Sequence, residues 1–281
     1  MCCGHTLQPA LCMKLRIATA AQGVHWVRDG FAAFRQQPIA LTSLFFFCFL
    51  VLGIVGAVPV IGFVLTFGLV PLFSLCMMLG GALTMQGQKP TLPVVLQALR
   101  MDPAQRKSFV ILGALFVLGL LLAVGLSTLF DGGEFARMFI LGEQIKQEAL
   151  TQSGVQLSAL TMTVMYLALT AIFWHAPGLV YWHRVPAVKA LFFSVVACMR
   201  NIGAFATYGL VWLAVNVGAL IALSLLGGLV ASVAGVAGGA IVLIAGSLVL
   251  SVVYFVSVVF SFRDCFEAPE QSAALPADPS E

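Results

Sequence analysis

The sequence IGAFATYGLVWLAVNVGALIALSLLGGLVASVAGVAGGAIVLIAGSLVLSVVYFVSVVFSF, residues 202–262, contains no aspartate, glutamate, lysine or arginine. About 20 apolar residues, rising 1.5 Å each, cross the roughly 30 Å hydrocarbon core of a bilayer. The stretch is therefore too long for one membrane-spanning helix and suits two helices joined by a turn. We expect the turn between Gly227 and Gly239, where glycine is dense, and spans at 202–226 and 239–262.

Four more apolar runs of membrane-spanning length precede this stretch. The whole 281-residue chain is 61% hydrophobic and only 9% charged, whereas soluble domains carry about 25% charged residues. The sequence predicts an all-α polytopic membrane protein with six spans in a single domain, 1–265. A tail at 266–281, rich in proline, alanine and acidic residues, is expected to be disordered. The four further spans are predicted at 39–58, 61–84, 109–130 and 158–181.

The distribution of lysine and arginine sets the orientation. Twelve of the 14 basic residues fall on one side of the predicted spans, and only Arg137 and Lys146 fall on the other. Loops rich in lysine and arginine stay in the cytoplasm. An even number of spans then places both termini there, in a bacterial inner (plasma) membrane.

Three basic segments on the cytoplasmic side share a pattern. Each has apolar residues at helical spacing and ends in an arginine, with a proline or glycine three residues further on. They indicate amphipathic helices near the membrane plane, each preceding a pair of spans in a weak threefold repeat. Alternatively, they are the basic helices that any inner-membrane protein places before its spans. The segments are 24–36, 91–101 and 187–200, and their arginines are Arg35, Arg100 and Arg200, which we expect to contact anionic lipid headgroups.

Other segments carry less information. The outer loop 131–157 has an apolar stripe and is expected to form a short helix on the bilayer surface. Translation starts at Met1 or at Met13, and the sequence leaves both open. The seven cysteines have no C-x-x-C spacing, which predicts packing residues rather than a disulfide framework or a zinc site.

The middles of the spans contain no charged residue, so a polar cavity within them would have to be lined by His, Asn, Ser, Thr or backbone groups. His175, two residues before Pro177, and Asn216 are the candidates for lining a polar cavity. The competing interpretation, which we favour, places His175 in an interfacial aromatic belt that runs from Trp174 to His183 and makes Asn216 a contact between helices. Pro71 is expected to kink the second span.

No motif for catalysis or for cofactor binding occurs in the chain. G-x-x-x-x-G-K-S/T, H-E-x-x-H, G-x-S-x-G and the dinucleotide fingerprint are all absent from the sequence. We therefore expect no enzyme activity, no cofactor and no metal, and nothing resembles a nucleic-acid-binding surface.

The stretch Ala176 to Gly203 supports a family resemblance. It reads Ala-Pro-Gly-Leu-Val at 176–180, then Pro186, Lys189-Ala190-Leu191, Ser194 and Arg200-Asn201. With the phrase at Gly30-Phe31, Phe34-Arg35 and Pro38, it resembles a family of uncharacterised six-span bacterial inner-membrane proteins. More distantly it is similar to the membrane domain found beside glycerophosphodiester phosphodiesterases. The resemblance covers about 20–265 and implies fold and location; no metal-binding acids of a phosphodiesterase are present, so it implies no activity.

Two functions from different classes fit these observations. The first is a scaffold or regulator that engages membrane lipids, including anionic phospholipid, or a protein partner or second copy, through the basic helices. The second is a transporter or exporter of an apolar or amphipathic small molecule, with a cavity at His175 and Asn216. The absence of charge within the spans favours the first function.

Overall fold

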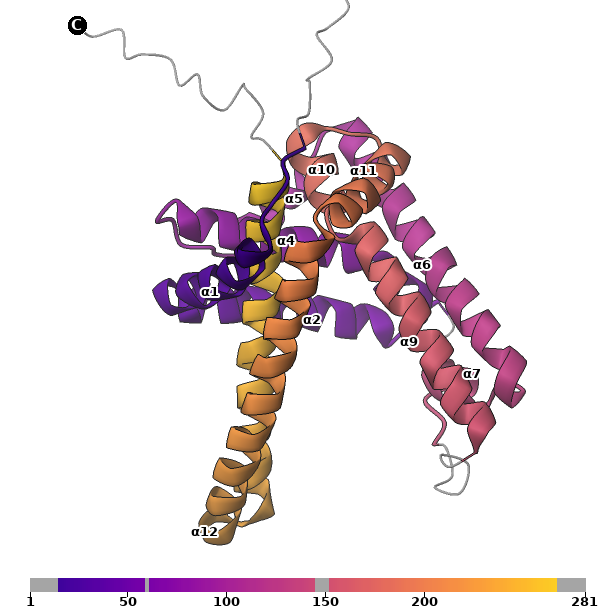
Figure 1. The fold of residues 1–281 in the computed structure, drawn as a ribbon, viewed down its shortest axis with the longest axis vertical. Helices are drawn as coiled ribbons and strands as arrows, with labels where there is room; N and C mark the ends of the chain where they lie inside the picture. The colour runs from indigo at the N-terminus through magenta and orange to yellow at the C-terminus, as the bar shows by residue number, and fades with distance from the viewer. Residues whose placement is uncertain (1–14, 59–60, 145–151, 267–281) are drawn as a thin grey trace, which may run out of the picture.

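A computed structural model describes residues 15–58, 61–144 and 152–266, and this part of the chain is helical almost throughout (Figure 1). Met1, Met13 and the tail at 267–281 lie outside the described residues, so the predictions made for them are not addressed. The helices are α1 (Ala20–Gln36), α2 (Pro38–Gly56), α3 (Gly62–Gly68), α4 (Val70–Met85), α5 (Pro93–Leu99), α6 (Pro103–Asp131), α7 (Glu134–Leu141), α9 (Ser153–Phe173), α10 (Ala176–His183), α11 (Ala187–Arg200) and α12 (Ile202–Cys265).

Five helical segments of the described chain are long and apolar enough to cross a membrane, and α12 is the longest of them, with 64 residues. The helix reverses at Gly235, whose φ of 78° and ψ of 174° are not helical. Its two arms lie side by side, because the Cβ of a residue at 239 would lie 2.6 Å from the carbonyl oxygen of Gly227 (Figure 1). The predicted turn between Gly227 and Gly239 is confirmed.

Two of the predicted spans are interrupted. The second ends as α3 at Gly68 and resumes as α4 at Val70, one residue before Pro71, so the expected kink is present. The fourth was predicted as one span, 158–181, but α9 ends at Phe173 and α10 begins at Ala176. Pro177 causes this second break, because proline has no N–H for the preceding turn and its ring clashes with the backbone there.

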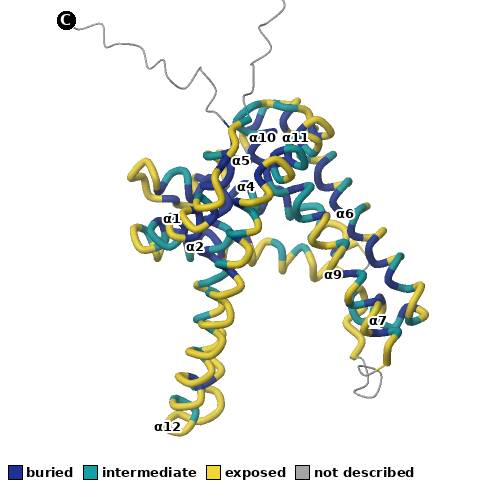
Figure 2. The backbone as a smooth tube through the Cα atoms, in the orientation of Figure 1, coloured by how far each residue is buried: buried dark blue, intermediate teal, exposed yellow. Residues whose placement is uncertain are grey.

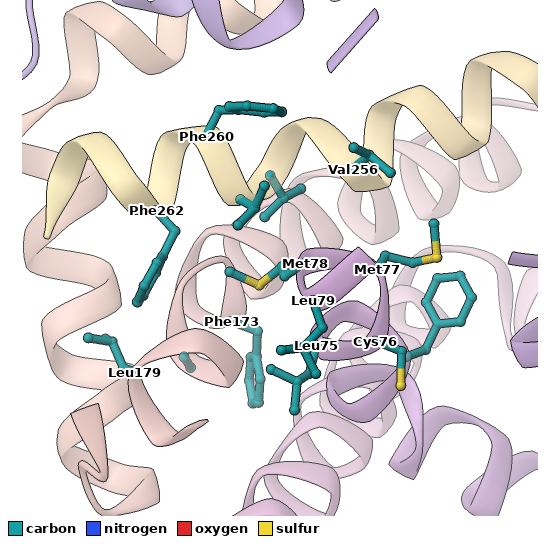
Figure 3. Close-up of a cluster of buried hydrophobic side chains, with 14 of the residues drawn as sticks. Leu75, Cys76, Met77, Met78, Leu79, Phe173, Leu179, Val256, Phe260 and Phe262 are labelled. Carbon is teal, nitrogen blue, oxygen red and sulfur yellow. The ribbon is translucent and has the colours of Figure 1, made fainter. Parts of the chain in front are cut away.

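The core lies where α4, α10 and the last turns of α12 meet (Figure 3). Small residues allow close contact: a Cβ on Gly81 would lie 2.8 Å from the side chain of Val259 and 3.2 Å from that of Val256, and one on Gly178 would lie 2.7 Å from the ring of Phe262. Away from this core the helices separate. The far end of α12 is exposed along both arms, and the α6–α9 pair extends as a second arm, while α2 runs across the view (Figures 1 and 2).

The three expected amphipathic segments are helical and lie around the core end of the molecule. α1 crosses the two arms of α12, α5 packs against α4, and α11 packs against α9 and α10. α7 forms the short helix expected after 131, and Phe139 on it packs against Phe63 and Phe67 of α3. The part of that loop at 145–151 lies outside the described residues.

Candidate lipid-contact surface and buried polar residues

Arg35 is presented by α1, which is fixed to α12 by two glycines. A Cβ on Gly23 would overlap the carbonyl oxygen of Ala204 in the first arm, and one on Gly30 would lie 2.7 Å from the Cβ of Ser257 in the second. Only glycine permits this approach, so the buried face of α1 is fixed against the hairpin. Arg35, in the last turn, is exposed on the opposite side.

Arg100 and Arg200 occupy similar places on the other two helices. Arg100 is the residue after the last turn of α5, and Arg200 is the final residue of α11. Both side chains are exposed. Within the described chain, the guanidinium groups of Arg35, Arg100 and Arg200 form no hydrogen bond or ion pair with another group. The three arginines are therefore open to an external anion rather than bound to helix carbonyls.

Three acidic residues that the structure describes at this end of the molecule, Asp29, Asp102 and Asp264, are already engaged. One oxygen of Asp102 accepts the backbone N–H of Gln105 at 2.8 Å, and the other lies 3.2 Å from Arg184. Arg263 lies between Asp29, at 3.4 Å, and Asp264, at 2.9 Å. The remaining cations at this end have no acidic partner in the described chain: Arg28, Arg35, Lys89, Arg100, Arg106, Lys107, Lys189 and Arg200.

His175 lies inside the bundle and is completely buried. Its ring is surrounded by Phe205, Phe262 and Phe266, with centroids 5.7, 5.9 and 5.3 Å away, and neither ring nitrogen has a hydrogen-bond partner in the described chain. The favoured interpretation of an interfacial belt is therefore wrong for His175. Trp174 of the same predicted belt is half-buried, and its indole N–H donates to the Ser261 hydroxyl at 3.0 Å.

The break beside His175 is bridged by Ser194 of α11. The Ser194 hydroxyl accepts the N–H of His175 at 3.0 Å and donates to the carbonyl of Ala171 at 3.2 Å. Backbone groups freed by a broken span need such partners in a membrane. On the same helix, the Cys198 thiol contacts the Ala171 carbonyl at 3.6 Å, and burial raises the pKa of this thiol to about 12.

Asn216 lies elsewhere, between the arms of α12. Its amide donates to the carbonyl of Trp212 at 2.8 Å. It lines a pocket of about 260 Å³ together with Ser247, Ser251 and Tyr254. His175 does not line this pocket, so the structure does not bring the two predicted cavity residues together.

Sequence reasoning missed the polar side chains that join distant segments. The Gln105 amide donates to the carbonyl of Tyr181 at 2.8 Å, and the Trp26 indole donates to Asp264 at 2.9 Å. Asn201 binds the backbone of Ala18 at 2.6 Å. Each partner lies more than 70 residues away in the sequence, so spacing gives no signal of these bonds; the buried amides among apolar residues were the one available indication. Within the described residues, no group of three or more histidine, cysteine or acidic side chains is placed to hold a metal ion.

Comparison with known proteins identifies a relative. A probable inner membrane protein of Burkholderia thailandensis is 34% identical over 264 residues, which cover 93% of this chain and 97% of the relative. The chain belongs to the same family as this protein. With its long apolar helices, it is a multi-pass inner membrane protein of bacterial type. No family model matches the chain, and no solved structure matches it. None of these findings links this inner membrane protein to glycerophosphodiester phosphodiesterases.

Proposed function

We propose that this inner membrane protein is a six-span scaffold or regulator that binds anionic phospholipid at its cytoplasmic end and catalyses no reaction. The cations at the core end, which have no acidic partner within the described residues, carry this proposal. An exposed guanidinium binds a phosphate through two parallel hydrogen bonds. Each basic residue near an anionic surface contributes about 1 kcal/mol, so Arg35, Arg100 and Arg200 together bias orientation and lipid choice.

The break in α12 supports six spans. Each arm has about 30 residues and is about 45 Å long at 1.5 Å per residue, enough to cross a bilayer. With α2, the α3–α4 pair, α6 and the α9–α10 pair, the number of crossings is even. The excess of lysine and arginine on one side supports placing both termini in the cytoplasm. On this assignment α1, α5 and α11 lie near the inner headgroups, and α7 lies on the outer side.

The alternative, a transporter with a polar cavity, has less support. Its two candidate residues lie apart: His175 is enclosed by aromatic rings, and Asn216 lines a pocket too small for most drug-sized ligands, which occupy about 300–1,000 Å³. The meeting point of the helices is packed with methionine, leucine and phenylalanine side chains (Figure 3). The proposal also includes binding of a protein partner or of a second copy of the chain to the exposed arms. It does not include binding of a nucleic acid.

The test replaces the three arginines together by glutamine, as Arg35→Gln, Arg100→Gln and Arg200→Gln. Native mass spectrometry of protein purified in neutral detergent then measures the retained acidic phospholipid. We expect its enrichment to disappear while the melting temperature changes little. The control is Arg137→Gln, which removes one exposed cation at the opposite end. Unchanged enrichment in the triple variant, or a collapse in melting temperature without loss of lipid, would overturn the proposal.

A further inference from the structure

A long apolar groove follows one face of α6. It has a volume of about 810 Å³. One wall is α6, and the other is formed by α3, the first turn of α4 and the end of α2. Among the residues that the structure describes, Arg106 is the only charged one that lines it. The apolar lining comprises Val55, Val64, Leu65, Gly68, Leu69, Leu72, Met101, Phe109, Val110, Gly113, Ala114, Val117, Leu118 and Leu121.

The groove follows from the break in the second span. Because the helix is interrupted at Leu69, α3 packs against α6 independently of α4. The closest approach of the two walls is at Gly113, where a Cβ would overlap the carbonyl oxygen of Gly68. Gly113 is buried at this contact, whereas Leu118, on the same lining face of α6, is exposed.

The groove is long enough to hold a lipid acyl chain. Arg106 and Leu121 mark its ends on α6, and the helix between them rises about 22 Å at 1.5 Å per residue. Half of a hydrocarbon core of about 30 Å is about 15 Å, the depth reached by the acyl chains of one leaflet. An extended acyl chain therefore fits along α6 with its polar end at Arg106.

The charge at the mouth fits a phosphate. Arg106 is exposed and has no acidic partner in the described chain. Its neighbour one turn earlier, Asp102, has both oxygens committed, to Gln105 and to Arg184. The guanidinium of Arg106 is therefore available for the two parallel hydrogen bonds that a phosphate accepts.

We infer that this groove binds one phospholipid molecule, with an acyl chain along α6 and the phosphate at Arg106. The inference rests on the proposed function and deepens it, because it names a built site for a single lipid in addition to the attraction of lipid by the basic helices. The occupant is a phospholipid rather than a soluble phosphate compound, since every residue of the lining below Arg106 is apolar.

The experiment uses two matched pairs of variants in the full chain. Arg106→Gln removes the cation at the mouth, and Lys107→Gln removes the adjacent cation, which does not line the groove. Leu118→Trp places bulk in the groove, and Leu122→Trp places the same bulk one turn further along α6, outside it; the two leucines are 62% and 57% exposed, so both replacements are tolerated by the fold.

Binding is measured by native mass spectrometry during titration with two probes, dioleoyl phosphatidylglycerol and dioleoylglycerol, which lacks the phosphate. We expect Arg106→Gln to weaken binding of the phospholipid about tenfold and to leave dioleoylglycerol unaffected. Leu118→Trp should weaken both probes about tenfold. Lys107→Gln and Leu122→Trp should match the wild type within about twofold.

Equal losses of lipid affinity in the two variants of either pair would overturn the inference, because diffuse charge or general packing would then explain the losses. Wild-type affinity in Arg106→Gln or in Leu118→Trp would also overturn it. Ala114→Phe, at another exposed position of the lining, repeats the block if Leu118→Trp fails to fold. The variant with glutamine at Arg35, Arg100 and Arg200 separates the two proposals. If it loses lipid enrichment while the groove variants bind normally, only the groove is wrong; if it keeps enrichment while the groove variants lose one lipid, only the role of the basic helices is wrong.

Discussion

Replacing Asn201 by alanine should release the N-terminal segment from the bundle. The Asn201 side chain is buried, its oxygen accepts the N–H of Ala18 at 2.6 Å, and its amide donates to the carbonyls of Arg16 at 3.2 Å and Ala197 at 3.0 Å. These bonds join the strand-like start of the described chain to the junction between α11 and α12. The segment is also held by the bond from the Arg16 N–H to the carbonyl of Cys265, at 2.9 Å.

The magnitude follows from which groups lose their partners. The buried Ala18 N–H loses its partner at a cost of about 1–3 kcal/mol, and the carbonyl of the exposed residue Arg16 loses a hydrogen bond that contributes about 0.5–1.5 kcal/mol. The Ala197 carbonyl keeps its bond from the backbone N–H of Asn201, at 3.0 Å, and adds nothing. We expect a loss of about 2–4 kcal/mol in the free energy that holds this segment in place. Asn201→Asp, which keeps the acceptor and loses the donors, should fall between alanine and the wild type.

Limited trypsin digestion in detergent measures this release, because trypsin cleaves after Arg16. Asn201→Ala should be cut there much faster than the wild type and should melt at a lower temperature. Asn216→Ala is the control, since the hydrogen bond from its side-chain amide stays within its own helix, to the carbonyl of Trp212. Cleavage of Asn201→Ala at the wild-type rate, with an unchanged melting temperature, would refute the reasoning.

Three further outcomes are expected. A membrane-impermeant thiol reagent added to intact cells should label Ile140→Cys and not Gln88→Cys, both exposed positions; the reverse result would refute the topology. Gly30→Ala should lower the melting temperature through a cost of about 1–3 kcal/mol, whereas Gly125→Ala, with open space around it, should leave it equal or higher. Burial raises the pKa of Cys198 from 9.0 to about 12, so its alkylation, followed by mass spectrometry, should stay slow up to pH 9, and rapid alkylation at pH 8 would contradict this. The stability linked to this thiol is complete below pH 9 and declines as the pH rises toward 12.

The placement of the helices could be predicted because the relevant physics is local. A stretch without charge, 202–262, that exceeds one membrane thickness has to reverse, and the turn falls at Gly235, the residue that adopts a positive φ at little cost. Pro71 likewise predicts the interruption between α3 and α4. The second interruption, at Trp174 and His175, has the same kind of signal in Pro177, but the apolar run continues across it and so predicts a single span.

The candidate sites were harder to predict because they depend on distant residues. The sequence around His175, beginning with Trp174, is typical of a membrane interface. Only the packing of Phe205, Phe262 and Phe266 places His175 in the core. Arg106 carried no signal beyond its charge. What distinguishes it is that Asp102, one turn away, is committed to Arg184 of another segment, and that pairing is not visible in the sequence.

The packing of the three basic helices bears on whether the chain arose from a threefold repeat. Each helix packs on the pair of spans that precedes it: α5 on α4, α11 on α9 and α10, and α1, which has no preceding pair, on the last pair in α12. Basic helices placed independently before their spans have no reason to follow this cyclic order. Parts of the second span of each pair, namely α4, α10 and the end of α12, meet in one core (Figure 3). Equivalent units arranged around a common axis would produce such a meeting point. The arrangement therefore favours duplication of a helix-plus-hairpin unit, in which Arg35, Arg100 and Arg200 stand at matching positions at the ends of the three basic helices.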